Sequence, residues 1–380
     1  MKKLATLFLA ALILVGGYAA IAAGGSSSDP LISQSYITNT YIPSVVKQAG
    51  ERIDSTTGKT YDDAATRLKA QADLHLAKAG ALSGGGYAAT FAEQRFKRGD
   101  ILTVDTGSEL MLLAGTATLA YDNGAVIDVT SGAVVPSGTA MANQRRYMAA
   151  ENTVLRATIT SDTAVLAPQG YYAVTPSSET DYNQLAAALK SMGLFKGTGT
   201  AYGSGYDLEL APTRIEGLVL FLRLVGEEKA ALAYVGDCPF VDVPDWGRQY
   251  VSYAYYRGYT KGVDIDLKLF GSYNTISSGE YLTFVLRALG YQDSGTNPDF
   301  TWDTALARAQ ALGCITAGEA VLLGPAKPFL RAQVAYLSYY SLSANRKAGG
   351  SLQSYLISGG ALSQSVVNTA QASVTVKRIA

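Results

Sequence analysis

Few residues in this chain are of the kinds that catalyse reactions or bind metal ions. Its 380 residues include one His and two Cys, which are too few for the usual zinc ligand sets or for a disulfide framework. It also lacks a nucleophile elbow, a phosphate-binding loop and a Ser/His/Asp set. We therefore expect no enzyme, no metal and no cofactor. A glycosidase with two catalytic carboxylates stays open, because Asp and Glu residues are numerous.

Acidic and basic residues balance, which limits the class of partner. The 31 Lys and Arg residues match 31 Asp and Glu residues, and charged residues make up only 16% of the chain. Without a basic excess, the sequence predicts binding neither to nucleic acid nor to an anionic lipid surface. Gly (39) and Tyr (25) are abundant instead. A surface of neutral polar and phenolic groups is typical of an extracellular protein more than of a cytosolic enzyme.

The residues best suited to bind a ligand lie in three similar windows. The windows read YDLELAPTRIE (206–216), FGSYNTISSGE (270–280) and LGPAKPFLRAQ (323–333). Each opens with a large apolar or aromatic residue, closes with Glu or Gln, and leads into a stretch with apolar residues at helical spacing. Upstream of each window, a helical stretch ends in a glycine turn. Three such units need one another to bury their apolar faces.

These repeats resemble the S-layer homology domain, a family that binds bacterial cell-wall polymers and normally comes in threes. Thr213–Glu216 matches the family's Thr-Arg-Ala-Glu phrase closely, and Leu330–Gln333 matches it in part, whereas Ser278 has replaced the arginine in the second window. The family's opening phrase, Phe-x-Asp-Val followed by Trp, is found over Phe240–Trp246. The resemblance covers residues 177–343 and implies an α-helical domain of pseudo-threefold symmetry.

The resemblance also implies an acidic wall polysaccharide as ligand, such as one that carries a pyruvate ketal. A guanidinium offers paired planar donors that match a carboxylate, so arginines are the implied acid-binding residues. The implied ligand-binding residues are Arg214, then Arg331, then Asp242 and Trp246 in the groove between repeats, with Lys196 and Lys261 as weaker cationic candidates. Binding should then depend on Arg214 far more than on Ser278. Two alternatives stay open: Arg214 pairs with a neighbouring acid, and Trp246 belongs to the core.

Ahead of the repeats, the apolar pattern changes from helical to alternating. Short runs rich in β-branched and aromatic residues follow one another from Arg98 to Val174, separated by turn signals such as Pro168–Gly170. This spacing predicts an antiparallel β sandwich or jelly-roll-like domain over residues 91–176. We interpret it as a structural, glycan-binding or protein-binding domain.

The two ends of the chain have their own patterns. Two lysines and an apolar run predict a signal peptide over residues 1–23, with an uncleaved membrane anchor as the alternative. Residues 24–90 are predicted to be a linker and an N-terminal helical segment, with two helices broken near Asp54–Gly58. Residues 344–380 are predicted to be a Ser/Gly-rich tail, with one strand over Ala372–Ile379.

The two cysteines, Cys238 and Cys314, fall in the second and third repeats. Cys314 takes the place of the apolar residues Leu194 and Tyr259, which predicts a buried thiol rather than a disulfide partner.

Taken with the resemblance, these patterns predict an exported cell-surface protein. It would be held non-covalently on a cell-wall polysaccharide or peptidoglycan-linked glycan, and would display the β-rich domain. Self-assembly at the surface is a further expectation, with no nucleic acid partner and no membrane contact after signal cleavage. The alternative is an exported structural, assembly or adhesion protein whose degenerate repeats act as a scaffold.

Overall fold

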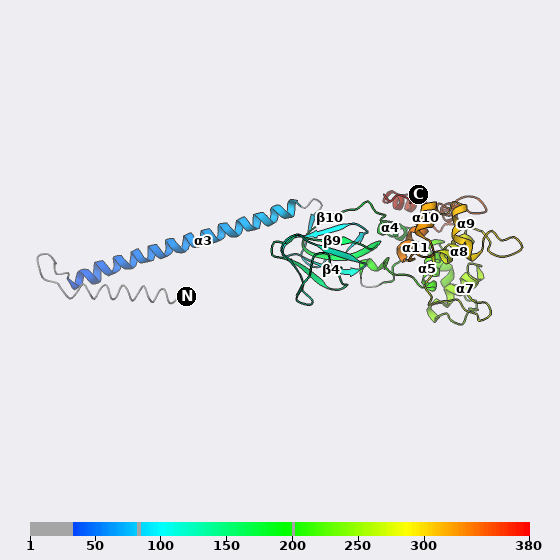
Figure 1. Ribbon diagram of the computed structural model, residues 1–380, viewed down its shortest axis with the longest axis horizontal. Helices are drawn as coiled ribbons and strands as arrows, with labels where there is room; N and C mark the ends of the chain where they lie inside the picture. The colour runs from blue at the N-terminus through cyan, green and yellow to red at the C-terminus, as the bar shows by residue number, and fades with distance from the viewer. Residues whose placement is uncertain (1–32, 82–84, 200–201) are drawn as a thin grey trace. The chain divides into compact units, whose positions relative to one another are not determined.

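The computed structural model describes residues 33–81, 85–199 and 202–380. The chain divides into two compact units between Lys78 and Ala79. The fold contains a long N-terminal helix, a curled antiparallel sheet and a group of helices (Figure 1). The predicted signal peptide lies outside the described residues. In the described part of the chain, no helix is both long enough and apolar enough to cross a membrane.

The first unit is helical throughout its described part. The short α2 (Gln34–Tyr36) and the π-helix η1 (Ile37–Tyr41) lead into α3 (Ile42–Ala81). The predicted break near Asp54–Gly58 is wrong, because α3 runs through this segment. The threonine hydroxyls there bond to carbonyls one turn back, from Thr56 to Arg52 at 2.7 Å and from Thr60 to Thr56 at 2.8 Å, so they are satisfied inside the helix.

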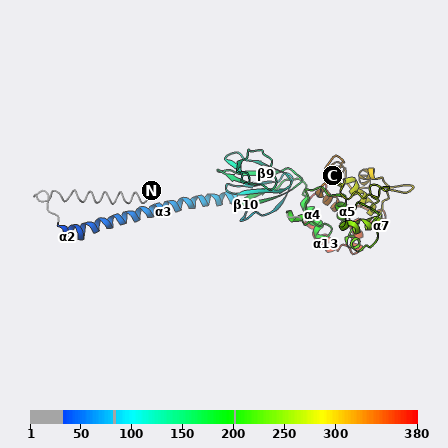
Figure 2. The same cartoon turned by 90° about the horizontal axis from the view of Figure 1, so that it is seen from below.

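The second unit begins with a ten-stranded sheet in which every strand pair is antiparallel. Its central order is β5-β9-β3-β10-β4-β8-β6-β7, and β1 and β2 also pair with β10. Figure 2 shows how this sheet curls. The strands are β1 (Gly85–Ala88), β2 (Gln94–Lys97), β3 (Ile101–Val104), β4 (Glu109–Ala114), β5 (Ala117–Ala120), β6 (Ala125–Asp128), β7 (Ala133–Val134), β8 (Arg146–Ala150), β9 (Leu155–Ile159) and β10 (Thr163–Thr175). Buried and half-buried residues alternate along β3, β5, β6, β8 and β9, so one face of each strand supplies a separate apolar core.

Two sequence predictions for the sheet are corrected. β1 lies inside residues 24–90, for which only a linker and a helical segment were expected. The expected turn at Pro168–Gly170 lies inside β10. Before this point β10 pairs with β2 and β4, and after it with β1 and β3. The Pro-Gln-Gly segment therefore marks where one strand changes partners, with Gly170 in the left-handed region at φ 91°.

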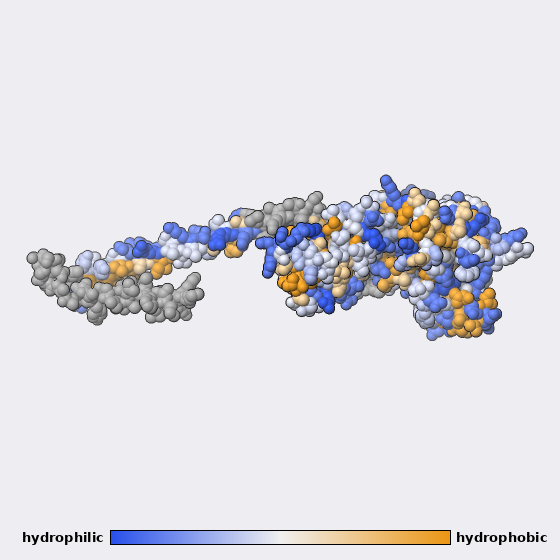
Figure 3. Space-filling model, viewed as in Figure 1, coloured by the Kyte–Doolittle hydropathy of each residue, from blue (hydrophilic) through white to orange (hydrophobic). Residues whose placement is uncertain are grey.

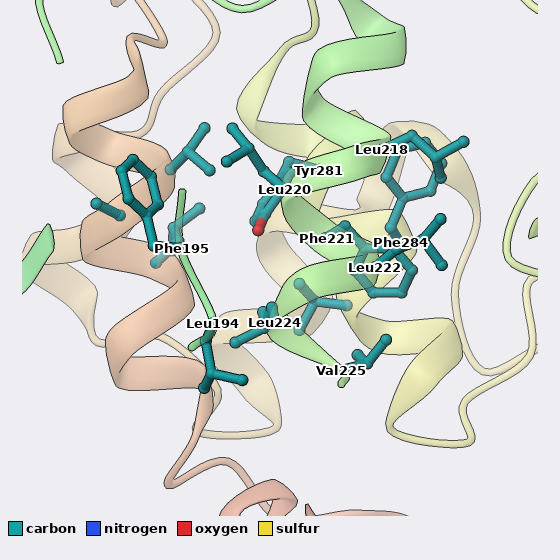
Figure 4. Packing of buried hydrophobic residues seen from close by; sticks show 14 of the residues in the cluster. Leu194, Phe195, Leu218, Leu220, Phe221, Leu222, Leu224, Val225, Tyr281 and Phe284 are labelled. Carbon is teal, nitrogen blue, oxygen red and sulfur yellow. The ribbon is translucent and has the colours of Figure 1, made fainter. Parts of the chain in front are cut away.

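Thirteen helical segments of the second unit make up the rest of its described fold. The three helices that follow the sequence windows are α5 (Arg214–Leu224), α8 (Ser278–Ala288) and α11 (Arg331–Ser341). The others are α4 (Tyr182–Ser191), α6 (Glu228–Leu232), α7 (Arg248–Tyr256), α9 (Ala305–Ala311), α10 (Ala317–Leu322), α12 (Leu352–Ser358), α13 (Gln364–Ala372) and the 3₁₀ turns η2 (Gly203–Gly205), η3 (Asp245–Gly247) and η4 (Trp302–Thr304). These helices share one apolar core, in which the rings of Phe221 and Phe284 lie 5.5 Å apart (Figure 4).

The first helix of each repeat ends in the same way. Gly193, Gly258 and Gly313 adopt left-handed φ values of 76°, 73° and 69° after α4, α7 and α9. The next residue in each case donates its N–H to a carbonyl five residues back and buries its side chain. These residues are Leu194, Tyr259 and Cys314, so the predicted equivalence of Cys314 with the two apolar residues is confirmed. Both cysteines are free thiols in the structure.

The predicted Ser/Gly-rich tail is part of the helical core. It folds into α12 and α13, whose Leu352, Leu356 and Val367 are buried there. The predicted strand over Ala372–Ile379 is wrong, because most of this segment has no regular secondary structure. It is held by side chains instead: Arg378 pairs with Glu319 at 2.8 Å, and the N–H of Ile379 donates to the Tyr336 hydroxyl at 2.9 Å.

Polar contacts join the sheet to the helices of the second unit. Arg95 of β2 donates to Asn183 of α4 at 2.7 Å and pairs with Glu209 at 2.5 Å. Gln333 of α11 donates to Asp162, which precedes β10, at 2.6 Å. The sheet therefore has its own core but is joined to the repeats by partly buried hydrogen bonds.

Candidate ligand groove

The three sequence windows place equivalent residues at three helix starts. α5, α8 and α11 each span 11 residues. Glu216 and Glu280 accept from the backbone N–H of Thr213 and Ser277, whose hydroxyls accept in return, so both helices begin with a capping box. Gln333 accepts from the N–H of Leu330 at 2.9 Å in the same way. The first helical residues are therefore Arg214, Ser278 and Arg331.

Each of these first residues contacts the window loop of another repeat, and the contacts close a ring. The N–H of Arg214 donates to Asn274 of the second window at 2.7 Å. The hydroxyl of Ser278 donates to the carbonyl of Leu323 in the third window at 2.6 Å. The N–H of Arg331 donates to Leu210 of the first window at 2.8 Å. The chain thus has three junctions: first to second, second to third, and third to first.

Arg214 is buried at the first-to-second junction. Its Nη1 pairs with Glu280 Oε1 at 2.6 Å, and its guanidinium lies 5.3 Å from the rings of both Phe270 and Phe284. Burial lowers the pKa of Arg214 below its ordinary value, and the neighbouring Glu280 carboxylate opposes that shift. The side chain is 7% exposed and already pairs with a carboxylate, which is the alternative that the sequence left open for Arg214.

Arg331 is equally buried at the third-to-first junction, but its partners are neutral. Nε donates to the carbonyl of Tyr206 at 3.1 Å, and Nη2 donates to the carbonyl of Lys196 at 3.4 Å. Among the residues that the structure describes, no carboxylate lies within ion-pair distance of this guanidinium. Burial lowers its pKa, and the charges of Glu216 and Asp207 oppose that shift from farther away. Arg331 therefore joins two repeats through backbone carbonyls.

The predicted lysines belong to two matching ion-pair clusters. Lys196 pairs with Glu228 at 2.5 Å, and Arg223 of α5 pairs with the same carboxylate at 2.8 Å. In the next repeat Lys261 pairs with Asp293 at 2.8 Å, and Arg287 of α8 contacts it too. Burial raises the pKa of each acid, but the hydrogen bonds from the two cations outweigh it and leave the pKa low. Both lysines are thus paired within their own repeats.

Asp242 and Trp246 have different surroundings. Both carboxylate oxygens of Asp242 accept backbone N–H groups, from Phe270 and Gly271 at 2.7 Å each and from Ser272 at 3.2 Å. Burial raises its pKa, but these three donors leave it below the ordinary value, so Asp242 shapes the second window rather than facing a ligand. Trp246 is 57% exposed, which excludes a core role. Trp302, in the equivalent turn before α9, is 74% exposed.

The second-to-third junction is the one that stays open. A groove of about 270 Å³ lies there, lined by Ala211, Thr275, Ile276, Ser277, Ser278, Pro325, Lys327, Pro328 and Phe329. In the described chain, the N–H groups of Ser278 and Gly279 donate to no acceptor, whereas their counterparts at Arg214 and Ile215 donate to the second window. A Cβ built on Gly279 would meet no atom within 4 Å. The start of α8 is therefore accessible from this groove.

The charges of this groove suit an anion. Lys327 is exposed, has no ion-pair partner among the described residues, and is the charged residue that lines the groove, where no carboxylate does. The positive end of the α8 dipole and the two unused N–H groups also favour an anion. Pro325 and Phe329 add an apolar wall. None of these groove residues was predicted, and the signal that could have found them was the Pro-x-Lys-Pro segment opposite the missing arginine.

A second, larger hollow has the opposite character. It encloses about 510 Å³ where the sheet meets the helices, and three carboxylates line it: Asp162, Asp207 and Glu209. Its other walls include Leu113, Val165, Leu210 and Leu330, and no Lys or Arg lines it. Arg95 and Arg98 pair with two of these carboxylates from outside the lining, so the hollow offers an acidic ligand no cation of its own. We therefore assign the candidate site to the smaller groove.

Comparison with known proteins identifies no relative of this chain. The chain matches no protein-family model. A search of curated proteins also finds no match. The function must therefore be inferred from the residues of the groove and their contacts.

Proposed function

We propose that this chain is an exported bacterial surface protein that binds an acidic wall polysaccharide non-covalently through three repeats of the S-layer homology type. The ring of three equivalent helix starts supports a pseudo-threefold arrangement of these repeats. The observation that carries the proposal is the open second-to-third junction, where the start of α8 and Lys327 share one groove. The curled sheet, proposed to be a sandwich or jelly-roll, would be the displayed part.

The groove offers each of the contacts that an acidic sugar needs. A ligand carboxylate accepts from the N–H groups of Ser278 and Gly279, as anions do at other helix starts. The Lys327 ammonium adds a charge-assisted contact. The sugar ring packs its apolar face against Pro325 and Phe329. The paired donors of an arginine guanidinium are not required, because the two N–H groups at the start of α8 take their place.

A scaffold that no longer binds sugar is the competing function. It is favoured by one observation: three of the four expected cationic ligands, Arg214, Lys196 and Lys261, are held in ion pairs within the protein. In a scaffold these pairs would serve only to hold the repeats together. The two functions differ in whether the chain recognises isolated wall material.

Co-sedimentation with purified cell walls separates the two. Walls that keep their secondary polysaccharide should pellet the protein, and walls stripped of that polysaccharide should leave it in solution. Equal sedimentation with both preparations would point to another wall component as the ligand. No sedimentation with either, by protein whose circular dichroism shows it folded, would favour the scaffold.

A further inference from the structure

One face of the long helix α3 has nine positions related by an 11-residue spacing, and six of them hold apolar residues. Three series of positions share this spacing: Ile42, Ile53 and Ala64; Val46, Thr57 and Leu68; and Ala49, Thr60 and Gln71. Within each block the steps are four, three and four residues, which keeps the side chains on one face of a helix. Figure 3 shows apolar residues along one edge of α3.

This face has no partner in its own unit. Ile42, Val46, Ile53 and Leu68 are between 49% and 67% exposed. Of the described side chains from residue 33 to residue 72, none is buried. An isolated helix is only marginally stable in water, and α3 contains Gly50, Gly58 and a Ser-Thr-Thr run. The ion pair of Lys47 with Glu51 spans 3.9 Å between exposed groups and adds little stability.

We propose that α3 associates with α3 of further copies of this chain as a parallel bundle. An 11-residue apolar repeat matches about 3.67 residues per turn, and helices with that period pack as a right-handed supercoil. Only a partner of similar length and period can cover a stripe that runs over residues 42–71. A second copy of the same helix has the same length and the same spacing of apolar residues, so it meets that requirement along the whole stripe.

The polar positions of the face agree with this occupant. Thr60 donates its hydroxyl to the carbonyl of Thr56 at 2.8 Å, so its polar atom is satisfied and its methyl group can be buried. Parallel copies in register stack Thr57 on Thr57 and Ile53 on Ile53, whereas an antiparallel pair centred on the stripe would set Ile53 against Thr60. Matching layers of like residues therefore favour the parallel register.

The charges beside the stripe also allow self-association. Between residues 47 and 69 the helix carries five basic and four acidic side chains, with the two signs interspersed: Lys47, Arg52, Lys59, Arg67 and Lys69 against Glu51, Asp54, Asp62 and Asp63. Copies of a nearly neutral helix do not repel one another, and opposite charges can meet across the interface. A cationic face of the kind that binds anionic lipid surfaces is not present on this segment.

The test is the mass of the full chain, without its predicted signal peptide, measured by light scattering at micromolar concentration. Wild type should run at two or more chain masses. Ile53→Asp should give a monomer, because it buries a charge in the stripe. Ser55→Asp adds the same charge on the opposite face, about 200° away around the helix, and should leave the assembly unchanged.

A second measurement checks orientation. In a Cys238→Ser background, Thr57→Cys should oxidise rapidly to a disulfide between copies, because like residues meet in the parallel register. Ser55→Cys should not. A monomeric wild type, an assembly that survives Ile53→Asp, or binding of α3 to lipid vesicles in place of self-association would overturn the proposal. None of these outcomes depends on whether the chain binds wall polysaccharide.

Discussion

At the residue that opens α5 and at the one that opens α8, the side chain matches the charge of the residue opposite it in the next repeat. Arg331, which opens α11, donates to backbone carbonyls instead. Arg214 has Glu280 as partner. The corresponding residue for the second repeat is Gln333, which is buried and uses its amide to donate to Asp162 at 2.6 Å. A carboxylate could not make that donation. An arginine at position 278 would therefore be a buried cation without a counter-charge, and serine stands there instead.

Gln333→Glu tests this account of the junction. The substitution replaces a donor to Asp162 with a second carboxylate in a buried place, and should lower the free energy of unfolding by about 1–3 kcal/mol. Urea denaturation followed by circular dichroism measures it. Adding Asp162→Asn should recover most of the loss, since an amide can donate to the new carboxylate. A double variant no more stable than Gln333→Glu alone would show that the two residues are not coupled.

Arg214→Ala should act on folding before it acts on any ligand. It removes the partner of Glu280 and the cation between Phe270 and Phe284. Because Glu280 is one-third exposed, the loss should be about 2 kcal/mol rather than the larger value of a fully buried pair. In a chain that already carries Glu280→Gln, Arg214→Ala should lower the free energy of unfolding by less than it does in wild type. A double-mutant cycle measured by urea denaturation detects this difference. Additive effects would contradict the pairing.

The residues at these junctions were predictable in position but not in role. The Thr-Arg-x-Glu phrase correctly placed Arg214 at a helix start, because capping chemistry is local. Its partner Glu280 lies 66 residues away in another repeat, and the two meet only when the ring of repeats closes. For the same reason the sequence could not show that Ser278, with its missing arginine, leaves a groove open.

At the scale of elements, the C-terminal segment completes the third repeat. Arg223 and Arg287 occupy equivalent places in the first two repeats, where the third has Tyr340. Arg378 from the end of the chain packs over the Tyr340 ring at 5.2 Å and pairs with Glu319, whose side chain is 0% exposed. The tail thus supplies a cation that the repeat itself lacks.

Arg378→Ala should therefore destabilise the helical core. It leaves the buried Glu319 carboxylate without its counter-charge, a change that lowers the free energy of unfolding by about 3 kcal/mol. Lys377→Ala, at the neighbouring exposed position, is the matched control and should change stability by less than about 0.5 kcal/mol. Thermal or urea unfolding compares them. Equal stability of the two variants would mean that the tail is not part of the core.

Element types were predicted well where one period dominates, and poorly where two signals compete. The alternating pattern correctly predicted short strands between Arg98 and Val174, and the helical spacing correctly predicted α5, α8 and α11. The sequence predicted a turn at the Pro-Gln-Gly segment inside β10. The residues that signal a turn are the same as those that allow a strand to change partners. α12 and α13 were missed because polar residues outnumber their buried apolar ones.

For the whole molecule, buried tyrosines predict a loss of stability at alkaline pH. Burial raises the pKa of Tyr182, Tyr253 and Tyr340 to about 12, and raises that of Tyr281 further. The unfolded chain ionises near its ordinary pKa of about 10 and the folded chain does not. Folding stability is therefore complete below pH 10 and falls as the pH rises from about 10 to 12.

Two signals followed against pH measure this effect. Tyrosinate absorbance should rise in two steps, an early one from exposed tyrosines and a late one that coincides with loss of helical circular dichroism. A single titration near pH 10 with unchanged helical signal would mean that these tyrosines are accessible to solvent in the folded protein.

The measurement that tests the central claim most directly is the affinity of the folded protein for extracted wall polysaccharide. Lys327→Glu should weaken binding about tenfold or more, because it puts a like charge beside the ligand carboxylate. Lys229→Glu, a matched reversal at an exposed lysine of α6, should bind like wild type. Polysaccharide whose carboxyl groups have been reduced should bind weakly to all three proteins. Equal affinity of wild type and Lys327→Glu for the native polysaccharide would contradict the account.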